Sequence, residues 1–343
     1  MFRRTLGIFG GVLVLALASA GYIQYKERPQ IRVSQNWSRF SGIDVGYIGD
    51  SLSTGMVRSH RNLTDAIRLI QSTPQNLVIG DFESSSGPVS LFEMMEKKVP
   101  LRIINYSRPG SDVFVREVVH EPNAFVRWLL NIPHLKKQVK QLLSRSDFPD
   151  LVVVWTGHME PLDWNDLKRV RDQGELKEFN DSRFAHEKDR DEALRKWIAQ
   201  KFSSDYEAQM QKILSRAQKE NRPFSLVIFA LYNWRNLTDI TEEIQRMKRS
   251  GFQGFTEARE RLDPEGSLKL YERLNQDLEK IAEDLTRVNQ SKNIHIIFNA
   301  NMASMKMGVV DIENDGMHPN VSGMKKISEQ IARAIQPEIE RIH

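Results

Sequence analysis

A serine hydroxyl and a histidine imidazole are the groups in this chain whose positions suit acyl-transfer chemistry. Ser51 lies in the stretch Gly-Asp-Ser-Leu-Ser, residues 49–53, directly after an apolar run. A serine becomes an effective nucleophile when a base takes its proton and a third group orients that base. Asp315 and His318 supply such a carboxylate and such a base from one segment near the C-terminus. These three residues form a candidate catalytic triad.

Each of these residues also has a purely structural interpretation. Ser51 suits the start of a helix, because a serine hydroxyl accepts hydrogen bonds from the free N–H groups of a first helical turn. The segment around Asp315 and His318 is rich in turn-forming residues, so a surface turn before the last helix explains it as well. The choice between the interpretations therefore depends on the elements that position the residues.

Five short apolar runs predict the strands of a sheet. Most are nearly continuous, as expected for parallel strands that are buried on both faces. The runs are 43–48, 101–104, 151–155, 224–231 and 294–298. Amphipathic helical patterns lie between them, so we expect an α/β fold with helices on both faces of a parallel sheet. Active sites of such sheets form at the carboxyl ends of the strands, where Ser51 lies.

Three segments exceed a minimal strand-to-helix connection and are expected to be insertions. They cover about 63–99, 163–222 and 233–264. An apolar stripe at helical spacing predicts a packed helix in the second one. The stripe consists of Leu194, Ile198, Tyr206, Met210, Ile213 and Ala217. Long insertions also serve as lids or partner surfaces, and both roles stay open here.

In the order and strand context of its motifs, the chain resembles the SGNH hydrolases, also called GDSL esterases and lipases. Residues 49–53 match the nucleophile block of that family, and Asn105 with Gly110 matches its second block. Asp315 and His318 match its last block, before the final helix. The resemblance implies a flavodoxin-like three-layer fold with a five-stranded parallel sheet.

The same resemblance implies a function. Ser51, His318 and Asp315 would form the triad of a serine esterase, and the N–H groups of Ser51 and Gly110 would bind the oxyanion. The expected substrate is an acyl ester of an envelope glycan or lipid, and no cofactor is expected. An O-acyltransferase would use the same residues, so hydrolysis and transfer both remain open.

One block departs from the family pattern. The family has Gly-x-Asn-Asp after the third strand, and its Asn side chain donates to the oxyanion, whereas residues 157–160 read Gly-His-Met-Glu. The thioether of Met159 cannot donate a hydrogen bond. This loss favours a catalytically silent envelope binding protein unless another group replaces the donor. His158, Asn165 and Asn233 are the candidates, although an exposed loop position is the first expectation for His158.

The N-terminus predicts export. A basic start is followed by an apolar run, and Ala18-Ser19-Ala20 has the small-x-small pattern of a signal-peptidase site. The run from Leu6 to Ile23 is also about long enough to span a bilayer, so residues 1–25 are either a signal peptide or a membrane anchor. We expect a polar linker at 26–40, a hydrolase-like domain at 41–343, and a location in the bacterial periplasm or cell envelope.

Composition excludes several other classes of protein. The 343 residues contain no cysteine, so the chain forms no disulfide and depends on its core for stability. The net charge of +4 is spread over the chain without a basic block, so nucleic acid is not an expected partner. Histidines at metal-ligand spacing are absent as well, and no metal site is expected.

Overall fold

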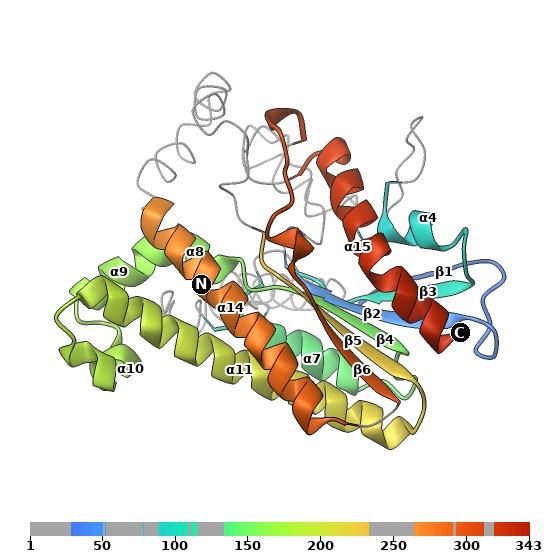
Figure 1. The fold of residues 1–343 in the computed structure, drawn as a ribbon, viewed down its shortest axis with the longest axis horizontal. Helices are drawn as coiled ribbons and strands as arrows, with labels where there is room; N and C mark the ends of the chain where they lie inside the picture. Colours follow the sequence, from blue (N-terminus) through green and yellow to red (C-terminus); the bar gives the residue numbers. More distant parts are fainter. Residues whose placement is uncertain are drawn as a thin grey trace, which may run out of the picture.

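A central sheet of six strands organises the protein (Figure 1). The computed structural model describes residues 29–50, 52, 78, 89–108, 111–114, 134–232, 264–290, 293–311 and 319–343. The strands are β1 (Gln30–Val33), β2 (Ile43–Gly49), β3 (Leu101–Asn105), β4 (Leu151–Trp155), β5 (Phe224–Phe229) and β6 (Ile294–Asn299). Their order across the sheet is β1-β3-β2-β4-β5-β6.

The five predicted strands are confirmed as β2 to β6, and all of them pair in parallel. Their order is the flavodoxin-like one, with the first of the five strands second from the edge of the parallel set. The expected number of five strands is corrected to six, because β1 adds an antiparallel edge strand along β3. This strand lies inside the segment that we expected to be a linker. Its side chains alternate between half-buried and exposed positions, a pattern too short to stand out over four residues.

The carboxyl ends of the central strands lie together. Every residue of β2 and of β4 is buried, as the continuous apolar runs predict. Gly49 at the end of β2 is level with Trp155 at the end of β4, and Tyr47 of β2 is level with Asn105 at the end of β3. Residues that follow these three strands therefore emerge at one edge of the sheet.

Helices cover both faces of the sheet (Figure 1). One face carries α7 (Leu135–Leu143), α11 (Arg190–Glu220) and α14 (Pro264–Val288), and the other carries α4 (Leu91–Met95) and α15 (Val321–Ile342). Shorter elements are α8 (Met159–Leu162), α9 (Trp164–Asp172), α10 (Lys177–Asn180), η1 (Arg183–His186), η3 (Ala300–Met302) and η4 (Val309–Asp311).

The segment 163–222, which we expected to be an insertion, is largely helical, and this agrees with the predicted apolar stripe. Its elements run from α9 to α11, and the whole predicted stripe of α11 is buried. Of the insertion at 63–99, the structure describes α4 and a few residues beside it, and the one at 233–264 lies outside the described residues up to 263. Residues 1–25 lie outside them too. Within the part of the chain that is described, no helix combines the length and the apolar character that a membrane crossing requires.

The last helix runs antiparallel to the strands. Glu338, near its C-terminal end, accepts a hydrogen bond of 2.7 Å from the hydroxyl of Ser225 at the amino end of β5. The first turn of α15 therefore lies toward the carboxyl edge of the sheet. There the helix approaches the carbonyl of Asp311 so closely that a Cβ on Gly323 would overlap it. Glycine at this position lets α15 pack against the segment that precedes residues 312–318.

We expect Gly323→Ala to destabilise the protein by about 1–3 kcal/mol, because the added methyl group forces α15 away from the Asp311 carbonyl. Urea unfolding followed by circular dichroism measures this change. Glu329→Ala, on the same helix, is the control and should change stability by less than about 0.5 kcal/mol. Equal stability of Gly323→Ala and the native chain would show that the helix does not need this close approach.

Candidate functional site

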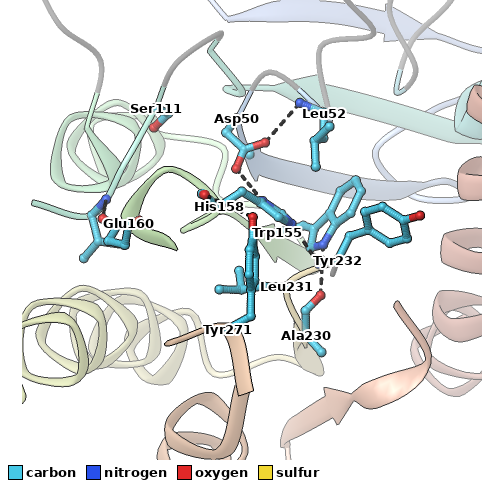
Figure 2. Close-up of polar contacts among 12 residues, drawn as sticks. Asp50, Leu52, Ser111, Trp155, His158, Glu160, Ala230, Leu231, Tyr232 and Tyr271 are labelled. Carbon is cyan, nitrogen blue, oxygen red and sulfur yellow. Dashed lines mark hydrogen bonds and ion pairs between the residues drawn. The ribbon is translucent and has the colours of Figure 1, made fainter. Parts of the chain in front are cut away.

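The turn after β2 is braced by Asp50 (Figure 2). Its Oδ1 accepts a hydrogen bond of 3.1 Å from the N–H of Leu52, two residues further along the chain. Its Oδ2 lies 2.6 Å from Nδ1 of His158, and both side chains are at most 2% exposed. Asp50 thus uses both carboxylate oxygens to connect Leu52 with His158 at the exit of β4.

His158 is buried and its two ring nitrogens are both engaged. Nε2 accepts a hydrogen bond of 3.0 Å from the backbone N–H of Tyr232, so the ring proton lies on Nδ1 and is donated to Asp50. The expectation of an exposed loop histidine is therefore wrong. With its single ring N–H already donated, His158 has no N–H left for an oxyanion and does not replace the donor that Met159 lacks.

The exit from β4 turns His158 into the core. Gly157 has φ +119°, which a side chain would strain, and a Cβ there would contact the ring of Phe202. The His158 ring meets Trp155 edge to face, at 5.1 Å between centroids. The hydroxyl of Tyr271 on α14 approaches the His158 carbonyl at 3.4 Å. His158 consequently joins the ends of β2, β4 and β5 under the site.

The turn after β3 is held by the side chain of Asn105. Asn105, buried at the strand end, accepts hydrogen bonds from the N–H and the hydroxyl of Ser107, at 3.0 and 2.6 Å. The carboxamide thereby caps the turn that leads toward Gly110.

A buried amide, Gln138 of α7, connects this loop with the end of β2. Its Oε1 accepts the N–H of Gly49 at 3.0 Å, and its Nε2 donates to the Gly49 carbonyl at 2.9 Å and to the hydroxyl of Ser111 at 2.7 Å. Sequence reasoning missed this residue. The available signal was a glutamine among the apolar residues of a helical stripe, Leu135, Val139 and Leu142.

A buried carboxyl, Glu160 of α8, holds the next part of the same loop. Its Oε1 accepts the N–H groups of Val113 and Phe114 at 2.7 and 3.2 Å. Complete burial, together with the nearby negative charge of Asp112, raises the pKa of Glu160 to about 8. Asp112 is itself buried and pairs with Nδ1 of His134 at 2.6 Å. Glu160 thus links α8 to the loop after β3.

The segment that contains Asp315 and His318 is fixed at both flanks. Asn320 donates its backbone N–H to the carbonyl of Asp311 at 2.9 Å, which brings the two flanks together. The carboxylate of Asp311 accepts from Ser322 at 2.8 Å and from Lys326 at 2.6 Å. Burial acts to raise the pKa of Asp311, but these bonds outweigh it and hold the pKa below its ordinary value.

The structure does not test the predicted triad. Ser51, Gly110, Asp315 and His318 all lie outside the described residues, as does Asn233. The structure describes residues near them in the sequence, namely Asp50, Leu52, Ser111, Asp311 and Pro319. Met159 begins α8, and Asn165 lies in α9. No group of three or more metal-ligating side chains occurs among the described residues.

Comparison with known proteins gives distant likenesses only. No protein-family model matches the chain, and no curated protein matches it. Among solved structures, the chain is similar to a lipase from a goat rumen metagenome, with 14% identity and a TM-score of 0.40 over 85% of this chain and 97% of that one. It is similar to TesA, with 12% identity and a TM-score of 0.38 over 86% and 99% of the two chains.

A third similar structure is a variant of an acetylxylan esterase from Geobacillus stearothermophilus. Its identity is 13% and its TM-score 0.40, over 87% of this chain and 94% of that one. Because these likenesses are so distant, the assignment of the site rests on the residues of the chain itself.

The raised pKa of Glu160 predicts that stability falls as pH rises. Between the ordinary carboxyl pKa of 4.5 and about 8, the folded chain holds a proton that the unfolded chain has lost. The contribution of Glu160 is thus complete below pH 4.5 and disappears as pH approaches 8, at a slope of at most about 1.4 kcal/mol per pH unit.

Glu160→Gln should flatten this dependence, because the neutral amide does not titrate. Urea unfolding at pH 5, 6.5 and 8 measures the slope for both proteins. The exposed Glu283→Gln on α14 is the control and should keep the native slope. Parallel slopes for Glu160→Gln and the native chain would mean that the carboxyl is charged throughout this range.

Proposed function

We propose that this chain is a serine esterase of the SGNH type, with Ser51 as nucleophile, His318 as base and Asp315 as the orienting carboxylate. The observation that carries the proposal is the set of buried bonds at the carboxyl edge of the sheet. The bonds join the residues beside Ser51 to those beside Gly110 and to the exit of β4. Tight bracing of these segments is what a preorganised acyl-transfer site requires.

In the proposed reaction, His318 removes the hydroxyl proton of Ser51 while Oγ attacks the ester carbonyl. The N–H groups of Ser51 and Gly110 bind the oxyanion that forms. The C–O bond to the alcohol then breaks, and the alcohol leaves with the proton from the imidazolium. Water repeats the sequence in reverse and releases the acid. An acceptor hydroxyl in place of water would make the protein an O-acyltransferase.

The proposed location is the bacterial cell envelope, based on the export pattern of residues 1–25. The proposed substrates are acyl esters found there, either O-acyl groups of a glycan or lipid esters. Similar structures include an acetylxylan esterase and a lipase, which represent both classes. Either substrate would enter at the carboxyl edge of the sheet.

Met159 favours a second candidate function, a catalytically silent protein that binds envelope glycan or a partner. Its thioether starts α8 at the position where the resemblance calls for an amide donor. His158 does not compensate for it, as its bonds to Asp50 and Tyr232 show. Losing one such donor from a working hydrolase costs about 100-fold to 1,000-fold in rate.

A fluorophosphonate probe distinguishes the two candidates, since it reacts with an activated serine. We expect the purified full chain to be labelled and to hydrolyse p-nitrophenyl acetate, and Ser51→Ala to lose both activities. His318→Ala should lose them as well, with the fold intact by circular dichroism. A folded native chain that neither reacts with the probe nor hydrolyses the ester would overturn the esterase proposal and favour the silent binding protein.

Met159→Asn should raise the esterase rate at least severalfold, because it restores an amide donor at the oxyanion position. The measurement is kcat for p-nitrophenyl acetate. Met159→Leu keeps an apolar side chain of similar size and should leave kcat unchanged. A rate for Met159→Asn at or below the native rate would indicate that another group already fills the oxyanion site.

A further inference from the structure

Gln138 is a polar residue on an otherwise apolar helix face. It is 1% exposed, and its neighbours on the buried face of α7 are Leu135, Val139 and Leu142. Burying an amide costs free energy unless its donors and acceptor are bonded. Gln138 meets this condition with three hydrogen bonds, two to the backbone of Gly49 and one to the hydroxyl of Ser111.

The two partners of Gln138 belong to different segments, one at the end of β2 and one in the loop after β3. Gly49 ends β2 and stands two residues before Ser51, whereas Ser111 directly follows Gly110. The Gly49 carbonyl also accepts a hydrogen bond of 3.1 Å from the N–H of Arg108, which is a second contact between the end of β2 and the loop after β3. Gln138 is therefore placed to set the separation between the two backbone segments that carry the proposed oxyanion donors.

We propose that Gln138 is a positioning residue, which fixes the end of β2 at Gly49 relative to Ser111 in the loop after β3 and thereby supports the proposed oxyanion donors that follow Gly49 and precede Ser111. This inference rests on the proposed function, since it assumes that these donors bind the oxyanion. Donors act when they lie about 2.7–3.1 Å from the oxyanion, and a displacement of about 1 Å can cost about 100-fold in rate. Because Met159 stands in place of the amide donor, the proposed site depends more strongly on the alignment of the two backbone donors.

The rest of the loop has its own anchors. Glu160 holds the N–H groups of Val113 and Phe114, and the Asp112 carbonyl accepts the N–H of Leu135 at 2.9 Å. Removing the hydroxyl of Ser111 leaves these bonds and the Gln138–Gly49 pair in place. Ser111→Ala therefore removes the link through Gln138 between the end of β2 and the loop after β3, and leaves the Arg108–Gly49 hydrogen bond in place.

The experiment compares kcat and KM for p-nitrophenyl acetate in the full chain and its variants. We expect kcat to fall about tenfold in Ser111→Ala and about 100-fold in Gln138→Met, with KM changed less than twofold. A lower kcat with a nearly unchanged KM shows that transition-state contacts are lost while substrate binding is kept. A purely structural role would lower the unfolding temperature and leave kcat of the folded enzyme as it was.

Ser225→Ala is the matched control. Ser225 is also fully buried, and its hydroxyl bonds to Glu338 at the opposite end of the sheet. This variant should lose about as much thermal stability as Ser111→Ala, with native kcat. Ser51→Ala, measured in parallel, reports on the proposed function itself.

The outcomes separate the two proposals. An active native chain, an inactive Ser51→Ala and a native kcat in Ser111→Ala and Gln138→Met would overturn the positioning role and leave the esterase proposal standing. A native chain without turnover would overturn both. A loss of kcat in Ser225→Ala equal to that in Ser111→Ala would also overturn the positioning role, because the loss would then follow from destabilisation alone.

Discussion

The buried pair of Asp50 and His158 is the interaction on which the rest of the site depends. A carboxylate and an imidazole, both almost inaccessible to water, are stable there because every strong donor or acceptor of the ring is bonded. The pair ties the end of β2 to the end of β4, and the Tyr232 N–H adds the end of β5. Removing either partner would leave a buried polar group unpaired, at a cost of about 1–3 kcal/mol or more.

Gln138 and Glu160 add two further hydrogen-bonded links between these segments. His158 joins the turn after β2 to the exit of β4, Gln138 joins that turn to the loop after β3, and Glu160 joins the same loop to α8. Each of the three segments is thus tied to the other two. A neutral amide and a carboxyl with a raised pKa suit this role, because neither places an uncompensated charge in the core.

The sequence predicts the elements better than the contacts between them. Strands β2 to β6 and the long helix α11 follow directly from apolar runs and helical spacing. Strand β1 escaped detection because four residues at a sheet edge bury too little to leave a pattern. The burial of His158 escaped it for another reason: its partners Asp50 and Tyr232 stand far away in sequence. The spacing of residues along the sequence does not reveal contacts between residues that come together only in the folded protein.

The direction of β1 decides where the chain enters the sheet. β1 runs antiparallel to β3, and Gln30 at its start pairs with Asn105, the last residue of β3. The first described strand therefore begins at the carboxyl ends of the parallel strands, the edge where the site is proposed. Whatever precedes residue 29 in the sequence is joined to the sheet on that side, and not at the amino ends of the strands.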